Sequence, residues 1–333
     1  VVGVIFGCIY LYSLYRKPLG VPLVLGPSPT IVISPSLPAT APPPSAPQAT
    51  FTPSPVAAMP ESTENKVCGQ SGALTILIIG SDAGDLRGRP GADLTRLTRV
   101  NFSDKKVSMF AFPRDLWVDA RGLGFENPLI TEITMGEIYY EAYLRSTQIE
   151  EAGKMRDSVQ VMAQMMLNNF NVTSDHYISI ALYRLPDLVD AIGGLPIDIP
   201  QRITDPWIGT VIEAGPQVLT GEQLISYARA IPDSDFARIQ RSDLILDALR
   251  SKLLEPGVWI KLPQLIEEFN DMIVTDLSPE QILNLFCLMQ EVGQEGITMK
   301  QVEAEWTSPG PSNSLLWNFS EVSAALKQLD LIP

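Results

Sequence analysis

The sequence predicts an α/β fold: a single domain of three layers (α-β-α) around a mixed central sheet. Short apolar runs bounded by turn residues alternate with longer segments whose apolar residues recur at helical spacing. At 333 residues and 45% hydrophobic composition, the chain can also bury a sizeable core. We expect this domain over residues 72–333, preceded by a membrane anchor at 1–17 and a disordered linker at 18–66.

The amino-terminal stretch Val1–Tyr15 is apolar and uncharged, and Arg16-Lys17 closes it. A membrane-spanning helix needs about 20 apolar residues, so we interpret the stretch as the last part of a spanning helix. The alternative is the apolar part of a cleaved signal peptide. Because no clear small-x-small cleavage site follows, an uncleaved signal anchor is the favoured interpretation.

The segment Pro18–Glu64 is rich in Pro, Ser, Ala and Thr. Such a composition buries too little apolar surface to fold and favours extended polyproline conformation. At roughly 3.1 Å per residue, it can hold the folded part on the order of 100 Å from the bilayer. The prediction is a solvated spacer.

The folded part begins with Leu74–Ile79, an apolar run typical of a buried strand, which ends at Gly80-Ser81-Asp82. A loop rich in Gly and Arg follows and delivers Asp93. A second strand, Val107–Phe112, ends at Pro113-Arg114-Asp115. In open α/β sheets the ligand crevice lies at the carboxyl ends of strands, so these charged residues are candidates for a metal and phosphate site.

Asp82 and Asp93 suit magnesium, which is held by one or two carboxylates while substrate phosphates complete its shell. Their spacing alone favours the alternative, in which each aspartate stabilises a turn by bonding its own backbone. The glycines between them form neither G-x-G-x-x-G nor a Walker A pattern, so a nucleotide-binding loop is unsupported.

The rest of the domain alternates helical and strand patterns. We expect helices over 155–170, 185–192, 221–230, 235–254 and 279–291, and strands over 176–180 and 195–199. Ser278 and Pro279 form a typical helix start, and the methionines of 155–170 are expected in the core. Beyond residue 291, Trp306 and Trp317 are expected to be packing residues rather than sugar-binding platforms.

Four arginines are candidates for an anion site: Arg114, Arg229, Arg238 and Arg241. Arg238 and Arg241 are three residues apart and therefore share a helix face. The guanidinium fork matches phosphate oxygens bidentately, which lysine cannot do. The residues alone favour the alternative, in which the arginines pair on the surface with Asp115, Asp235 or Asp243.

Composition limits the function classes. The net charge of −14 argues against a nucleic-acid partner, and the lone His176 excludes a multi-histidine zinc site. Cys8, Cys68 and Cys287 show no C-x-x-C spacing. Cys68 and Cys287 can pair outside the cytosol, but nothing in the sequence brings them together, and two unpaired thiols are the favoured interpretation.

Several motifs, in one order, resemble the LytR–CpsA–Psr family of cell-wall glycopolymer transferases. The matching stretches are Leu77–Asp82, Asp93–Thr95, Val107–Met109, Pro113–Asp115, Asp187–Gly194, Leu219–Gln223, Tyr227–Arg229 and Ser234–Arg241. The resemblance covers about residues 74–290, and an anchor followed by a spacer fits the family's layout.

The resemblance implies a membrane-anchored, single-pass phosphotransferase with its folded domain outside the cytoplasm. It would transfer a phosphosugar polymer from a polyprenyl-pyrophosphate carrier, whose tail occupies an apolar tunnel, to a peptidoglycan hydroxyl. By position, Asp82 and Asp93 would hold Mg²⁺ (or Mn²⁺). The pyrophosphate-binding residues would be Arg114, Arg229, Arg238 and Arg241, and the catalytic residues Asp93, Arg114 and Arg238. Asp93 has a second open role, deprotonation of the acceptor.

The sequence departs from the family pattern at three places: Gly91 stands where an arginine is expected, Glu132-Ile133-Thr134 replaces Lys-Ile-Asn, and Ser242 replaces a glutamine. Arg87 or Arg89 can reach in from the same loop. A missing arginine near the phosphates would cost orders of magnitude in rate. Two alternatives therefore stand beside the transferase: a weakly active protein that binds the lipid carrier, and a lipid-pyrophosphate hydrolase.

Overall fold

A computed structural model describes residues 15–26, 67–82, 91–125, 127, 129–204, 209–230 and 234–333. Most of the predicted anchor and linker lies outside these residues, as do Arg87 and Arg89, so those expectations stay predictions. The described part of the linker, residues 18–26, is instead packed on the folded domain, because Leu23 and Leu25 contact the main core. Within the described part, no helix combines the length and the apolar character needed to span a bilayer.

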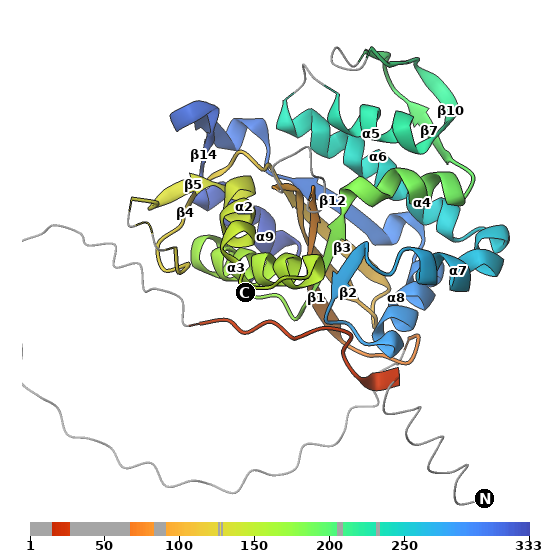
Figure 1. Ribbon diagram of the computed structural model, residues 1–333, viewed down its shortest axis with the longest axis horizontal. Helices are drawn as coiled ribbons and strands as arrows, with labels where there is room; N and C mark the ends of the chain where they lie inside the picture. Colours follow the sequence, from red (N-terminus) through yellow and green to blue (C-terminus); the bar gives the residue numbers. More distant parts are fainter. Residues whose placement is uncertain are drawn as a thin grey trace, which may run out of the picture.

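A six-stranded mixed sheet forms the centre of the fold (Figure 1). Its order is β11 (Ile273–Thr275), β6 (His176–Ala181), β1 (Ala73–Ser81), β2 (Ala92–Asn101), β3 (Lys106–Phe112) and β12 (Ile297–Gln301). β1 runs parallel to β6, and β3 runs parallel to β12, whereas the other neighbours are antiparallel. The predicted α/β fold with a mixed central sheet is confirmed.

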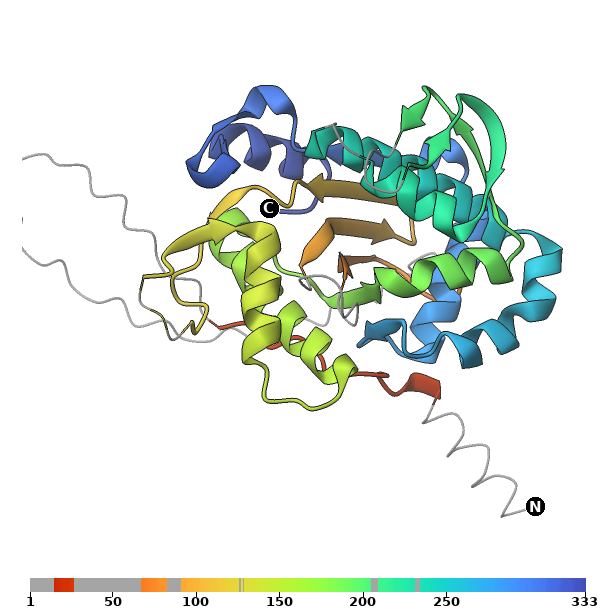
Figure 2. The ribbon, with the colours of Figure 1, turned by 45° about the horizontal axis from the view of Figure 1, so that its top comes forward.

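Helices cover both faces of the sheet because side chains alternate along each strand. Leu77 and Ile79 of β1 pack with α2 (Met135–Arg145), α3 (Glu151–Phe170) and α9 (Phe319–Gln328). Ile76 packs on the opposite face against α8 (Pro279–Glu291). The long helix α6 (Asp235–Leu253) crosses that second face, where it contacts β2. Figure 2 shows the sheet between these two sets of helices.

A smaller unit with its own core lies at one end of α6 (Figure 2). Its elements are α4 (Leu185–Ala191), β7 (Leu195–Ile199), β10 (Gly215–Leu219) and α5 (Gly221–Arg229). The other regular elements are α7 (Pro256–Glu268), the pairs β4 (Trp117–Asp119) with β5 (Glu132–Thr134), β8 (Ile203–Thr204) with β9 (Val211–Ile212), and β13 (Thr307–Pro309) with β14 (Leu315–Trp317), and short 3₁₀ turns at Leu182–Arg184, Gln294–Gly296, Ala304–Trp306 and Pro311–Asn313.

The predicted helices are present, and the methionines of α3 are buried in the main core. Ser278 caps α8 by accepting a hydrogen bond from the Gln281 amide. Trp306 and Trp317 pack against the same core. Sequence patterns missed the strand β2 and the helix α2, so the expectation that a loop delivers Asp93 was wrong: Asp93 is the second residue of β2.

Cys68 and Cys287 form a disulfide, which corrects the favoured interpretation of two unpaired thiols. They are 219 residues apart in sequence. The turn before β1 nevertheless packs with α8, because Cys68 and Leu285 belong to the same hydrophobic cluster. This contact is a product of the tertiary fold, which is why spacing could not reveal it.

Candidate functional site

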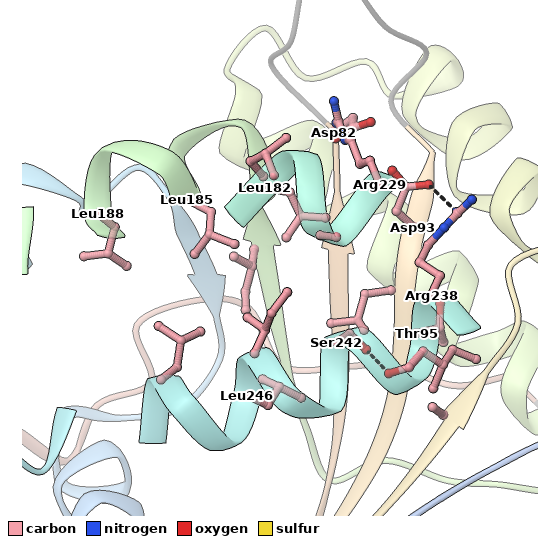
Figure 3. Close-up of a pocket in the computed structure, with 18 of the residues that line it drawn as sticks. Asp82, Asp93, Thr95, Leu182, Leu185, Leu188, Arg229, Arg238, Ser242 and Leu246 are labelled. Carbon is pink, nitrogen blue, oxygen red and sulfur yellow. Dashed lines mark hydrogen bonds and ion pairs between the residues drawn. The ribbon is translucent and has the colours of Figure 1, made fainter. Parts of the chain in front are cut away.

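A cavity of about 420 Å³ opens between one end of the sheet and the helices α4, α5 and α6. Charged side chains gather at one end of the cavity, whereas leucines and isoleucines line the remainder (Figure 3). The charged residues are Asp82, Asp93, Arg114, Arg229 and Arg238, and the apolar lining includes Leu182, Leu185, Leu188, Leu246 and Ile273. The site is therefore amphiphilic, with a charged mouth and an apolar interior.

Strand register brings the charged residues together. Ser81 at the end of β1 pairs with Ala92 at the start of β2, so Asp82 and Asp93 lie at the same edge. Thr95 of β2 pairs with Phe112 at the end of β3, which places Arg114 at that edge too. Asp82 and Arg114 thus lie just beyond strand ends, as expected, and Asp93 joins them from the start of β2.

The two remaining arginines come from helix ends. Arg229 is the last residue of α5, and Arg238 lies in the first turn of α6. The α6 amino terminus is capped by Ser234, which accepts from the Ala237 amide. Because a helix amino terminus carries partial positive charge, α6 adds to the attraction of this mouth for anions.

The arginines and aspartates of the mouth form direct ion pairs. Arg229 pairs with Asp82. Arg114 Nη1 lies 2.6 Å from Asp93 Oδ1, and Arg238 Nη1 lies 3.8 Å from the same oxygen. Each aspartate thus has at least one guanidinium partner, and each guanidinium faces the cavity.

Asp235 orients two of these arginines from the side of α6. Its Oδ1 lies 3.7 Å from Arg114 Nε and 3.3 Å from Arg238 Nη1, while its Oδ2 accepts from the Asp115 amide at 3.3 Å. The Asp235 side chain is only 7% exposed, so the carboxylate is held tightly. Arg114 and Arg238 therefore pair with neighbouring carboxylates, as the alternative interpretation expected, and they also line the cavity.

The pKa of the Asp82 carboxyl is raised above its ordinary value. Burial and, next, the nearby charge of Asp93 together raise the pKa of its carboxyl to about 6, against the opposing effect of Arg229. A buried carboxylate beside another carboxylate is destabilised as an anion. A divalent cation bound between the two would relieve exactly this repulsion.

The donor set fits a magnesium ion that also binds phosphate oxygens. Magnesium uses one or two carboxylates in such sites, and Asp82 and Asp93 supply two. No group of three or more His, Cys, Asp or Glu side chains suited to a metal occurs among the described residues. An ion here would accordingly depend on the ligand's oxygens to complete its shell.

Arg241 does not line the cavity. Its side chain is buried, and its Nη2 donates to the Ala230 carbonyl oxygen at 2.9 Å. Ala230 follows the last residue of α5, so this bond ties α6 to the chain that carries Arg229. The geometry gives Arg241 a positioning function, and its expected direct contact with pyrophosphate stays a prediction.

Sequence reasoning missed Arg96, which is fully buried beneath the cavity. Its guanidinium lies 2.5 Å from both Ser242 Oγ and Asp243 Oδ1, and so fastens β2 to α6. Ser242 lines the cavity and was noted only as a departure from the family pattern. No sequence signal singled out Arg96, because its strand β2 was not predicted and its partners lie on α6.

The other two departures have different surroundings. The Gly91 carbonyl oxygen accepts from the Asp82 amide at 3.4 Å, so this glycine lies at the charged mouth. Glu132–Thr134 forms β5, away from the residues that line the cavity. Of the three departures, Ser242 and Gly91 therefore lie at the site, whereas Glu132–Thr134 does not.

The chain is similar to known proteins in both sequence and fold. Residues 50–329 match the LytR_cpsA_psr family. A relative from Enterococcus faecalis, named polyisoprenyl-teichoic acid–peptidoglycan teichoic acid transferase TagU, is 28% identical over 211 residues, which is 61% of each chain. Regulatory protein MsrR from Staphylococcus aureus is 21% identical over 197 residues, 58% of this chain and 53% of its own.

Solved structures share the fold. TagV of B. subtilis superposes with a TM-score of 0.60 at 19% identity, covering 79% of this chain and 100% of that one. A structure of TagT bound to LIIa-WTA gives 0.55 at 17% identity, covering 81% and 94%. The chain spans less than two thirds of the length of the curated relatives. The family match nevertheless covers most of this chain, residues 50–329. The chain therefore belongs to the LytR_cpsA_psr family.

Proposed function

We propose that this protein transfers a phosphosugar polymer from a polyprenyl-pyrophosphate carrier to a hydroxyl of peptidoglycan. The observation that carries the proposal is the amphiphilic cavity, in which three arginines and two aspartates border an apolar interior. A lipid pyrophosphate has this same division between a charged head and an apolar tail. The names of the teichoic acid transferase TagU and of the TagT complex agree with this substrate class.

In the proposed reaction, Arg114, Arg229 and Arg238 bind the pyrophosphate oxygens and balance the charge that grows on the leaving phosphate. The acceptor oxygen bonds to the phosphorus that carries the glycan, and the bond to the lipid phosphate breaks. Polyprenyl phosphate leaves, and the hydroxyl proton passes to a carboxylate, for which we assign Asp93. A magnesium or manganese ion held by Asp82 and Asp93 would supply further neutralisation of the phosphates.

We also propose that the folded domain lies outside the cytoplasm and is attached by an amino-terminal membrane helix. The apolar stretch Val1–Tyr15 supports the anchor. The Cys68–Cys287 disulfide supports the compartment, because such bonds persist in oxidising surroundings.

The decisive experiment compares Arg114→Ala with the native protein, using a lipid-linked glycan donor and a peptidoglycan acceptor. Arg114 contacts Asp93 and lines the cavity, so its loss should lower transfer by about 100-fold or more. Arg121→Ala is the control, because Arg121 is 70% exposed and pairs with Asp119 outside the cavity. Full activity of Arg114→Ala would contradict the assignment.

One observation favours a second candidate, a weakly active protein that binds the lipid carrier. Gly91 lies at the mouth and contributes no side chain where the family resemblance places an arginine. Gly91→Arg distinguishes the two: a large gain in turnover would indicate a depleted native site, and no gain supports the active transferase. Release of lipid phosphate without any acceptor would instead indicate a hydrolase.

A further inference from the structure

Residues 15–26, which we call the N-terminal strap, lie against the folded domain on the side of α3 and α8 (red in Figures 1 and 2). The Leu19 amide donates to the Leu277 carbonyl oxygen at 3.1 Å. Arg16 Nε lies 2.7 Å from Glu280 Oε2 in the first turn of α8. The first half of the strap is therefore joined to the chain that leads into α8.

The second half of the strap is held by two glutamines of α3. The Val24 amide donates to Gln160 Oε1 at 3.0 Å, and Gln160 Nε2 donates back to the Val24 carbonyl oxygen at 2.5 Å. One helical turn later, Gln164 Oε1 accepts from the Gly26 amide at 2.7 Å. Two side chains spaced four apart thus pair with an extended backbone much as a neighbouring strand would.

Apolar packing adds to these bonds. Leu23 and Leu25 pack against the main core, whereas Val24 between them is 75% exposed, which is the alternation of an extended segment on a surface. Gly20 allows the closest approach: a Cβ there would lie 2.5 Å from the Thr275 carbonyl oxygen and 3.0 Å from Tyr177 Oη. The strap is a fitted part of the domain.

We propose that the strap seats the folded domain directly on the surface of the lipid bilayer that holds the anchor. This inference rests on the anchor proposed above. The strap begins at Tyr15, the last residue of the apolar stretch, so its docking leaves no free chain between the proposed anchor and the domain. Residues 27–66 then start from one docked point, Gly26, and return to another, Val67, and their length does not set the height of the domain.

The surface around the strap suits a bilayer. Leu19 and Val21 are 62% and 56% exposed beside the start of α8. Ile282 and Leu283, within one turn of Glu280, are also exposed. Leu19 and Val21 follow the proposed anchor within a few residues in the sequence, so the surface that these apolar side chains would meet is the bilayer.

Seating on the bilayer would place the cavity within reach of a lipid tail. Ile273 lines the apolar part of the cavity, and Leu277, four residues later, binds the strap. Four residues of extended chain span at most about 14 Å. A free spacer over 18–66 would instead separate the cavity from the bilayer by on the order of 100 Å. The strap shortens the path that a lipid-linked substrate must take.

The first test measures the height of the domain with the full chain in lipid nanodiscs. A donor dye at the exposed position Val218 reports energy transfer to acceptor dyes on lipid head groups. Deleting residues 30–60 should leave the transfer efficiency unchanged. A rise in efficiency on deletion would show that the linker sets the height, and would overturn the proposal.

The second test releases the strap with Gly20→Ala, whose Cβ meets the Thr275 backbone. Energy transfer should fall, and exchange of the Leu19 and Val24 amides should speed up about tenfold for each lost hydrogen bond. Gly26→Ala is the matched control, because its Cβ would make an ordinary 3.5 Å contact with Gln164. Equal exchange and height in both variants would overturn the proposal.

A separate pair of variants, Gln160→Ala and Gln164→Ala, removes the half-buried glutamines that hold the strap without changing a core residue, and should reproduce the effect of Gly20→Ala. All of these measurements need neither glycan donor nor acceptor. A domain seated on the bilayer that transfers nothing would contradict the proposed function and leave the strap intact. An active domain held far from the bilayer would contradict the strap proposal and leave the proposed function intact.

Discussion

The acidity of Asp82 makes a quantitative prediction about metal binding. A cation binds the ionised carboxylate, so protons compete with it below the pKa of about 6. About 90% of Asp82 is ionised at pH 7 and about 10% at pH 5, whereas an ordinary aspartate would stay more than about 90% ionised at both. We therefore expect the affinity for Mn²⁺ alone, measured by electron paramagnetic resonance, to fall about tenfold from pH 7 to pH 5.

The control is Asp119→Asn, which removes an aspartate paired with Arg121 outside the cavity and should keep the tenfold change. Stability gives an independent check. Since the folded-state pKa of Asp82 is raised, its favourable contribution is full below the ordinary value near 4 and is lost as pH rises through 6. Asp82→Asn should therefore raise the free energy of unfolding at pH 8, by about 1–3 kcal/mol. An Mn²⁺ affinity that changes less than twofold over this range would refute the argument.

Three further predictions concern contacts that stabilise the fold or hold the site residues in place. Asp243→Ala leaves the buried Arg96 guanidinium without its carboxylate and should cost about 3–5 kcal/mol in urea unfolding; a loss below 1 kcal/mol would contradict a buried pair. Reduction of Cys68–Cys287, which closes a loop of 219 residues, should cost up to about 5 kcal/mol by the same measurement, and an unchanged midpoint would oppose it. Asp235→Asn loosens both arginines that it holds and should lower the transfer rate by about 10–100-fold while lipid binding persists; an unaltered rate would show that the carboxylate does not position them.

Strands with continuous apolar runs could be predicted from sequence, but β2 could not. β1 and β3 carry Ile, Leu, Val and Phe in succession, whereas β2 alternates apolar residues with Thr and Arg. Arg96 is buried because Asp243 neutralises it from α6, and Arg99 donates to Thr75 Oγ1 on β1. Both partners are distant in sequence, so hydropathy alone gave the segment the character of a loop.

The site residues, too, fall into those that the sequence could identify and those that it could not. Asp82 and Arg114 could be proposed because turn residues mark where strands end. Asp93 was proposed from a presumed loop, although it lies at the start of β2. The grouping of Arg229 and Arg238 with them came only from the order of motifs. Asp235, which orients two arginines at once, could be considered beforehand only as a surface partner, because its effect depends on the angle at which α6 approaches the sheet.

The disulfide has a consequence for how this protein withstands proteases. Cys68 and Cys287 enclose every residue assigned to the site, from Asp82 to Arg241. A single cleavage anywhere between the two cysteines leaves the fragments covalently joined, and the packed sheet can hold them in place. Nicked molecules would therefore migrate as one species until a reducing agent separates them, which would protect the extracytoplasmic domain proposed above from a single proteolytic cut.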